Sequence, residues 1–240
     1  MRWVADTTGR FAQRPHYAPA EIDAECEGLV DSFLRERRGR VEYPFETNDL
    51  IALIEREAED LDIYADLTSE GQDVEGATYF NPQGRARVRI SRRLADEPWS
   101  TNRFRTTASH ELGHVKFHNF LWPLEPRPAL FYADEAPLSD VSPRCKRDAI
   151  QPLKPLDWME WQAGYACGAL LMPLTRVQKL ARTVSGLGLA PRVVGTPETL
   201  DLISLVKKAF EVSADAARVR LIQLRLLAPA GSQTSTLPLA

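Results

Sequence analysis

Two histidines and a glutamate stand close together in the stretch TTASHELGHVKFH, where His110, Glu111 and His114 form the pattern HExxH. Residues four apart on a helix lie one above the other, with side chains ~5–6 Å apart. Two imidazoles placed in this way can both reach one zinc ion at about 2.0–2.1 Å. Glu111 lies to the side of that pair, where its carboxylate can take a proton from a water bound to the ion. The spacing therefore predicts one Zn²⁺ per chain, held by His110 and His114, with Glu111 as the general base.

The same stretch contains a third histidine, His118, and the whole chain has only four. His118 is one helical turn beyond His114 and would be poorly aimed at an ion that the first two histidines hold. We expect it to pack beside the site, with metal ligation as the alternative. Gly113 is about 1 kcal/mol worse than alanine inside a helix, which indicates that another backbone approaches this helix closely.

A catalytic zinc ion commonly has three protein ligands and one position for water, so a further ligand is required. The helical segment DWMEWQAGYACGALLMP offers Asp157, Glu160 and Gln162. Glu160 shares a stripe with small and apolar residues, and a carboxylate on such a packing face needs a partner because an unpaired buried charge is very costly. Asp157 is a secondary candidate, and Gln162 is a poor zinc ligand on another side of the helix. Glu160 is therefore the predicted third ligand, and a salt bridge from Glu160 to an arginine is the alternative.

Three blocks follow one another along the chain: RFRTTASHELGHVKFH, EWQAGYACGALLMP and FEVSADAARVRLIQL. In this order they resemble the ImmA/IrrE family of zinc metallopeptidases, over about residues 49–227. The resemblance places His110 and His114 on the family's histidine ligands and Glu111 on its catalytic glutamate. Many members have a second glutamate where Gln162 stands, so Glu160 is the glutamate available for ligation in this chain. The implied fold is α+β: a helical zinc-peptidase core with a small, mainly antiparallel sheet, the HExxH helix packed on a second ligand-bearing helix, and a C-terminal helical pair.

Members of this family act on proteins, and several cleave or regulate helix-turn-helix repressors during mobile-element induction or stress responses. The resemblance therefore implies a cytoplasmic zinc-dependent endopeptidase whose substrate is a regulatory protein, a helix-turn-helix transcriptional regulator encoded nearby. The alternative is a non-catalytic, zinc-stabilised regulator that binds a repressor or DNA. The intact Glu111 favours the enzyme, because a structural zinc site needs no general base and is usually closed by four ligands.

Helices and a small sheet must position these side chains. A strand is expected over residues 61–67, and a hairpin over 76–91 with its turn at Asn81-Pro82-Gln83-Gly84. The period of apolar residues predicts the remaining elements as helices. They begin at Ala20, after Thr47 or Asn48, at Pro98 (ending at His118), at Asp157 (ending near Pro173) and at Leu174, and two more lie between Thr199 and Leu227.

The predicted domain organisation has four parts. They are a loose N-terminal segment (1–18), a zinc metallopeptidase domain (19–185) with a proline-rich insertion (119–156), a C-terminal helix-turn-helix-like cap (198–227) and a disordered tail (228–240). Arg218, Arg220 and Arg225 lie on or near the last helix, so DNA docking is conceivable. The basic patch is modest, and a cap on the peptidase core is favoured over a DNA-binding module.

The composition suits an ordinary globular protein, with 44% hydrophobic and 26% charged residues. A net charge of −3 gives no general attraction to nucleic acid or to anionic membranes. The three cysteines are widely spaced, which favours reduced thiols and a cytoplasmic location. No apolar run approaches the ~20 residues that span a bilayer, and the N-terminus shows no apolar core of a signal peptide. We therefore expect no membrane partner.

Overall fold

A computed structural model describes residues 1–97, 100–124, 144–146, 157–184 and 192–228, which fall into two compact units, Met1–Leu171 and Met172–Ala240. The elements of the first unit are β1 (Arg2–Ala5), β2 (Gln13–His16), α1 (Pro19–Arg38), α2 (Thr47–Glu57), β3 (Asp60–Ala65), β4 (Val74–Tyr79), β5 (Arg87–Ser91), α3 (Arg92–Asp96), α4 (Thr101–His118), α5 (Leu121–Leu124), β6 (Arg144–Lys146) and α6 (Trp158–Leu171). Those of the second unit are α7 (Leu174–Thr183), β7 (Arg192–Val193), α8 (Pro197–Phe210), α9 (Ala214–Gln223) and β8 (Leu227–Ala228).

The main sheet of the described residues has the strand order β3-β5-β4-β6. β5 runs parallel to β3 and antiparallel to β4, and β4 runs antiparallel to β6. The expected hairpin is β4–β5, and in its turn the backbone N–H of Gln83 donates to Oδ1 of Asn81 (2.9 Å). The α+β class and the small, mainly antiparallel sheet are thus confirmed.

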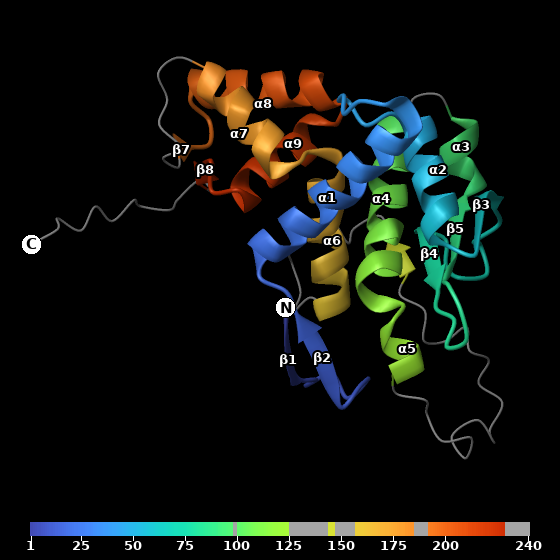
Figure 1. Cartoon of the computed structure of the whole chain (residues 1–240). Helices are drawn as coiled ribbons and strands as arrows, with labels where there is room; N and C mark the ends of the chain where they lie inside the picture. The colour runs from blue at the N-terminus through green and yellow to red at the C-terminus, as the bar shows by residue number, and fades with distance from the viewer. Residues whose placement is uncertain (98–99, 125–143, 147–156, 185–191, 229–240) are drawn as a thin grey trace, which may run out of the picture. The chain divides into compact units, whose positions relative to one another are not determined.

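Buried apolar residues alternate with more exposed charged residues along β5, so one face of this strand is directed toward the core. Val88 and Ile90 are fully buried, whereas Arg87 is exposed, as expected of a half-buried strand. In Figure 1, α4 lies between α6 and the sheet, and it contacts both. This central position buries almost every side chain of α4 from Phe104 to His118.

The N-terminus of α4 has no side-chain cap. Residues 98 and 99, where the helix was expected to start, lie outside the described residues, and α4 begins at Thr101. Ser100 occupies the N-cap position, but its hydroxyl donates to Glu97 (3.0 Å) and caps no helical N–H. The C-terminal end at His118 is as predicted.

The N-terminal residues form an antiparallel hairpin, β1–β2, and the prediction of a loose segment over residues 1–18 is wrong. Asp6 stabilises its turn, since its carboxylate accepts hydrogen bonds from the backbone N–H groups of Thr8 and Phe11 (3.0 Å each) and from the indole of Trp158 (3.2 Å). The last bond spans 152 residues. Apolar contacts also hold the hairpin, since Phe11 packs on Trp122 and Trp158, with ring centroids 5.0 and 6.3 Å apart. All of these partners are distant in the sequence, so no local pattern predicts the hairpin.

The boundary between the two compact units lies at residues 171 and 172, before α7, and not after residue 185 as the predicted metallopeptidase domain had it. α7 contacts α8 within the second unit. The predicted C-terminal helical pair is present as α8 and α9, and the hydroxyl of Ser213 caps α9 by accepting from the N–H of Ala216 (3.1 Å).

Arg220 does not belong to the predicted basic patch. Its side chain is fully buried, and its Nε donates to the carbonyl of Met172 (3.0 Å). Arg218 is exposed but lies 3.3 Å from Asp215, which partly neutralises it. The surface available for nucleic acid on α9 is therefore smaller than the sequence suggested.

Most of the predicted proline-rich insertion (125–143 and 147–156) and nearly all of the predicted tail (229–240) lie outside the described residues. None of the helices in the part of the chain that the structure describes has the length and apolar character needed to cross a membrane.

Candidate metal centre

α4 and α6 pack closely against each other at Gly113. A Cβ atom on Gly113 would lie 3.0 Å from Cα of Ala163 and 3.2 Å from Cβ of Ala166. The expectation that this glycine admits a neighbouring backbone is therefore confirmed. Gly164, one of the small residues predicted on the same face of α6 as Glu160, has no atom within 4 Å of its Cβ position. Ala163 and Ala166, rather than Gly164, therefore make the close contact with Gly113.

This close packing brings His110, His114 and Glu160 together. One oxygen of Glu160 lies 3.2 Å from Nε2 of His110, and the other lies 3.4 Å from Nε2 of His114. The two Nε2 atoms are 3.1 Å apart. One ligand atom from each residue falls within 4.8 Å of the others. Two imidazole nitrogens and one carboxylate oxygen at this spacing make a donor set suited to zinc.

The electrostatics of the three groups favour a cation between them. Burial alone would raise the pKa of Glu160, but His114 and His110 outweigh it and hold that pKa well below its ordinary value. Burial lowers the pKa of His114. For His110 the effect of burial is outweighed by Glu160 and Glu111, and its pKa is raised. The cluster therefore presents the carboxylate of Glu160 and the neutral imidazole of His114 at neutral pH.

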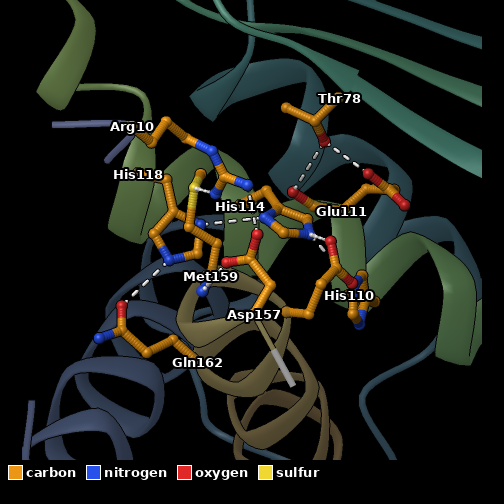
Figure 2. A network of polar contacts seen from close by, with 10 residues as sticks. Arg10, Thr78, His110, Glu111, His114, His118, Asp157, Met159 and Gln162 are labelled. Carbon is orange, nitrogen blue, oxygen red and sulfur yellow. Dashed lines mark hydrogen bonds and ion pairs between the residues drawn. The ribbon is translucent and has the colours of Figure 1, made fainter. Parts of the chain in front are cut away.

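Glu111 is fully buried beside the cluster and is held from one side only (Figure 2). The hydroxyl of Thr78 donates to its Oε2 (2.6 Å), whereas Oε1 has no hydrogen-bond partner among the described residues. Burial raises the pKa of Glu111 to about 7. A carboxylate with that pKa is matched to taking up and releasing a proton at neutral pH.

His118 lies beside the donor set rather than in it. Its Nδ1 is 2.9 Å from Nδ1 of His114, and its Nε2 is 3.0 Å from the amide oxygen of Gln162 (Figure 2). His118 therefore contacts His114 and Gln162, and it is not among the three described side chains that converge as potential metal ligands.

Asp157, the secondary candidate, is also outside the group. It forms an ion pair with Arg10 and accepts from the N–H of Met159 (2.9 Å) at the start of α6. Its position before the first helical residue is that of an N-cap.

Sequence reasoning missed four residues around the centre: Thr78, Gly76, Arg10 and the hydrogen-bonding role of Gln162. Thr78 and Gly76 come from β4, whose pattern predicts a strand but not what faces the helix. Gly76 was a usable signal, because a glycine within a strand often marks a close approach. Nothing local pointed to Arg10 or to the orientation of the Gln162 amide.

Comparison of the chain with models of protein families gives no match. Comparison with curated protein sequences gives none either.

Proposed function

We propose that this protein is a zinc-dependent endopeptidase of the ImmA/IrrE type that hydrolyses peptide bonds in a regulatory protein. His110, His114 and Glu160 would hold the zinc ion, and Glu111 would act as the general base. The observation that carries this proposal is the convergence of three potential metal ligands beside a fully buried carboxylate, one oxygen of which has no hydrogen-bond partner among the described residues.

The residues fit a catalytic rather than a structural zinc ion. A structural site is usually closed by four protein ligands, whereas a catalytic site has three and an open position. Three ligand residues converge among the described residues. An unpaired carboxylate oxygen costs free energy in a folded protein, and its retention is explained if Glu111 serves a reaction.

A bound zinc ion would supply Lewis acidity that lowers the pKa of a water toward ~7 and polarises a substrate carbonyl. The protein supplies the proton acceptor. Thr78 fixes Oε2 of Glu111 and so leaves Oε1 for the attacking water. With a pKa of about 7, Glu111 can accept the water proton and then pass it to the leaving amine.

The substrate class is taken from the sequence resemblance. Three blocks in family order, including the HExxH and Glu160 segments, support a regulator of the helix-turn-helix type, encoded nearby, as the protein that is cut. The small exposed basic surface of α9 gives DNA binding little support.

Metal content tests the first half of the proposal. Wild-type protein should carry one zinc ion per chain by elemental analysis, and His114→Ala should carry almost none. His16→Gln is the matched control, because His16 lies in β2 and contributes no atom to the donor set. Wild-type protein that binds no zinc when the metal is supplied would contradict the proposal.

Cleavage tests the second half. The zinc-loaded protein is incubated with the regulator encoded beside its gene, and products are identified by mass spectrometry. Wild type should give defined fragments, and Glu111→Gln should bind zinc but give none. Fragments that persist with Glu111→Gln would remove Glu111 from its role. Binding of the intact regulator by wild type with no fragments would favour a non-catalytic regulator instead.

A further inference from the structure

A chain of hydrogen bonds connects a backbone carbonyl of the N-terminal hairpin to the predicted zinc ligand His114. The side-chain amide nitrogen of Gln162 lies 2.9 Å from the carbonyl oxygen of Pro15. The amide oxygen lies 3.0 Å from Nε2 of His118, and Nδ1 of His118 lies 2.9 Å from Nδ1 of His114. Figure 2 shows the part of this chain from Gln162 through His118 to His114.

The donor and the acceptor of each hydrogen bond can be assigned by starting from the carbonyl of Pro15. A carbonyl oxygen only accepts, so the NH₂ group of Gln162 must face Pro15, and the amide oxygen must face His118. That oxygen also only accepts, so Nε2 of His118 carries the hydrogen. A neutral imidazole has one N–H and one lone pair, which leaves the lone pair of His118 on Nδ1. His114 must then donate from its own Nδ1.

This direction determines which nitrogen of His114 can bind a metal. With its hydrogen on Nδ1, the lone pair of His114 is on Nε2. That atom is the one that lies 3.4 Å from Glu160 and 3.1 Å from Nε2 of His110. The other tautomer would place a hydrogen where the three ligand atoms converge and would have to be reversed before metal could bind.

We infer that His118 and Gln162 are positioning residues, which hold His114 in the Nδ1–H tautomer and so set the affinity of the site for zinc. The inference rests on the proposed function only in taking zinc as the metal. Zinc-bound histidines generally donate their second N–H to a carboxylate, a carbonyl or water. Here the acceptor is a second imidazole, which fixes the tautomer without adding negative charge to the site.

Because these residues are buried, the order of donors and acceptors along this series of hydrogen bonds is hard to reverse. His114 and His118 are fully buried, Gln162 is 1% exposed, and Pro15 is buried as well. A rotated Gln162 amide would set its oxygen against the oxygen of Pro15, and both would lose a buried hydrogen bond. The rings of Trp158 and His118 pack in a T-shaped arrangement with centroids 5.5 Å apart, which limits the movement of His118.

Ring ¹⁵N spectra of the metal-free wild type test the tautomers directly. The chain has only four histidines, which keeps the spectrum simple to assign with single substitutions. His114 should carry its hydrogen on Nδ1 and His118 on Nε2. The opposite assignment for either ring overturns the inference, whatever the protein does with zinc.

Zinc affinity, measured by competition with a chelator, tests the consequence. Gln162→Met keeps the length of the side chain and removes both hydrogen bonds, and it should weaken zinc binding by ~10–100-fold. Tyr165→Phe is the matched control, because it removes a buried hydrogen bond to Asp23 (2.9 Å) from the same helix without touching the chain of bonds. It should lower the melting temperature and leave zinc affinity unchanged.

The outcomes separate the two proposals. Equal zinc affinity in wild type and Gln162→Met, with zinc bound by both, overturns the inference and leaves the proposed function intact. No zinc binding by wild type contradicts the proposed function, and the ring spectra then decide the tautomers alone. If Gln162→Met does not fold, the ring ¹⁵N spectra of the metal-free wild type decide the inference alone, since they need no variant of Gln162.

Discussion

Gly76 in β4 lies against the carboxylate of Glu111 so closely that a Cβ atom on Gly76 would be 2.6 Å from Oε1 of Glu111. The same Cβ would be 2.7 Å from Cγ2 of Thr107. The end of a glutamate side chain can move more easily than a backbone. An added methyl group would therefore displace the carboxylate before it displaced the strand.

Gly76→Ala should lower peptide cleavage by at least ~10-fold, because misplacement of a catalytic group by about 1 Å can cost 10²-fold. Zinc content should stay at the wild-type value, since neither histidine nor Glu160 is touched. Overpacking should reduce the free energy of unfolding by roughly 1–3 kcal/mol. Gly164→Ala in α6 is the control: with no atom within 4 Å of its Cβ position, it should keep activity and gain up to ~1 kcal/mol. Unchanged cleavage by Gly76→Ala would show that Glu111 does not work from its observed position.

Thr78→Val should shift the pH dependence of cleavage upward. The hydrogen bond from Thr78 lowers the pKa of Glu111, so its loss raises that pKa above its present value of about 7. A general base acts only when it is deprotonated, and each unit of increase costs about 10-fold in rate at a pH below the pKa. The measurement is kcat/KM against pH. Thr78→Ser keeps the hydroxyl and should restore the wild-type profile. A Val variant whose profile coincides with wild type would exclude this coupling.

Glu111→Gln should stabilise the metal-free protein at neutral and alkaline pH. The folded pKa of Glu111 is about 7, against an ordinary value of 4.5. Below 4.5 both the folded and the unfolded chain keep the proton, and the residue has no pH-linked effect. Between 4.5 and about 7 only the unfolded chain loses it, so the free energy of unfolding falls as pH rises, by about 3 kcal/mol in all.

Urea unfolding in the presence of a chelator, across this pH range, measures the effect. The curves of wild type and Glu111→Gln should differ by a constant amount below pH 4.5 and separate progressively up to about pH 7. If the difference in unfolding free energy between wild type and Glu111→Gln does not grow with pH, the folded protein does not raise the pKa of Glu111.

Gly113→Ala should separate the two ligand-bearing helices. Its Cβ would meet Cα and the carbonyl oxygen of Ala163 at 3.0 and 3.2 Å, and these backbone atoms cannot move aside singly. The free energy of unfolding should fall by roughly 1–3 kcal/mol. Zinc binding should also weaken, because His110 belongs to α4 and Glu160 to α6, and the added methyl group pushes these helices apart. Gly28→Ala in α1, with no atom within 4 Å, is the matched control and should lose neither. Wild-type zinc affinity in Gly113→Ala would show that the helix spacing tolerates the methyl group.

The part of the site that the sequence predicts is the part built from helical periodicity. His110 and His114 share one face because they are four residues apart, and Glu160 was identified because a carboxylate on a small-residue helix face needs a partner. Both arguments use only local geometry and the cost of a buried charge. The same reasoning correctly placed His118 outside the donor set.

The residues that the sequence did not predict depend on contacts between distant segments. Thr78 and Glu111 are 33 residues apart, and Gln162 and Pro15 are 147 apart. A periodic pattern tells which face of an element is buried, but not which atom it meets. The burial of Arg220 was not predicted for the same reason. An arginine on a helix is normally exposed, and nothing in the local sequence indicates that its Nε donates to the carbonyl of Met172.

Because of the β1–β2 hairpin, the site includes residues that lie outside the three sequence blocks described above. Those blocks contain the proposed metal ligands, whereas the carbonyl that accepts from Gln162 comes from Pro15, about ninety residues before the first of them. Two proteins with identical blocks but different N-terminal segments would then share a ligand set and differ in how strongly they retain zinc. Sensitivity to metal limitation could diverge among relatives through a segment that motif comparison ignores.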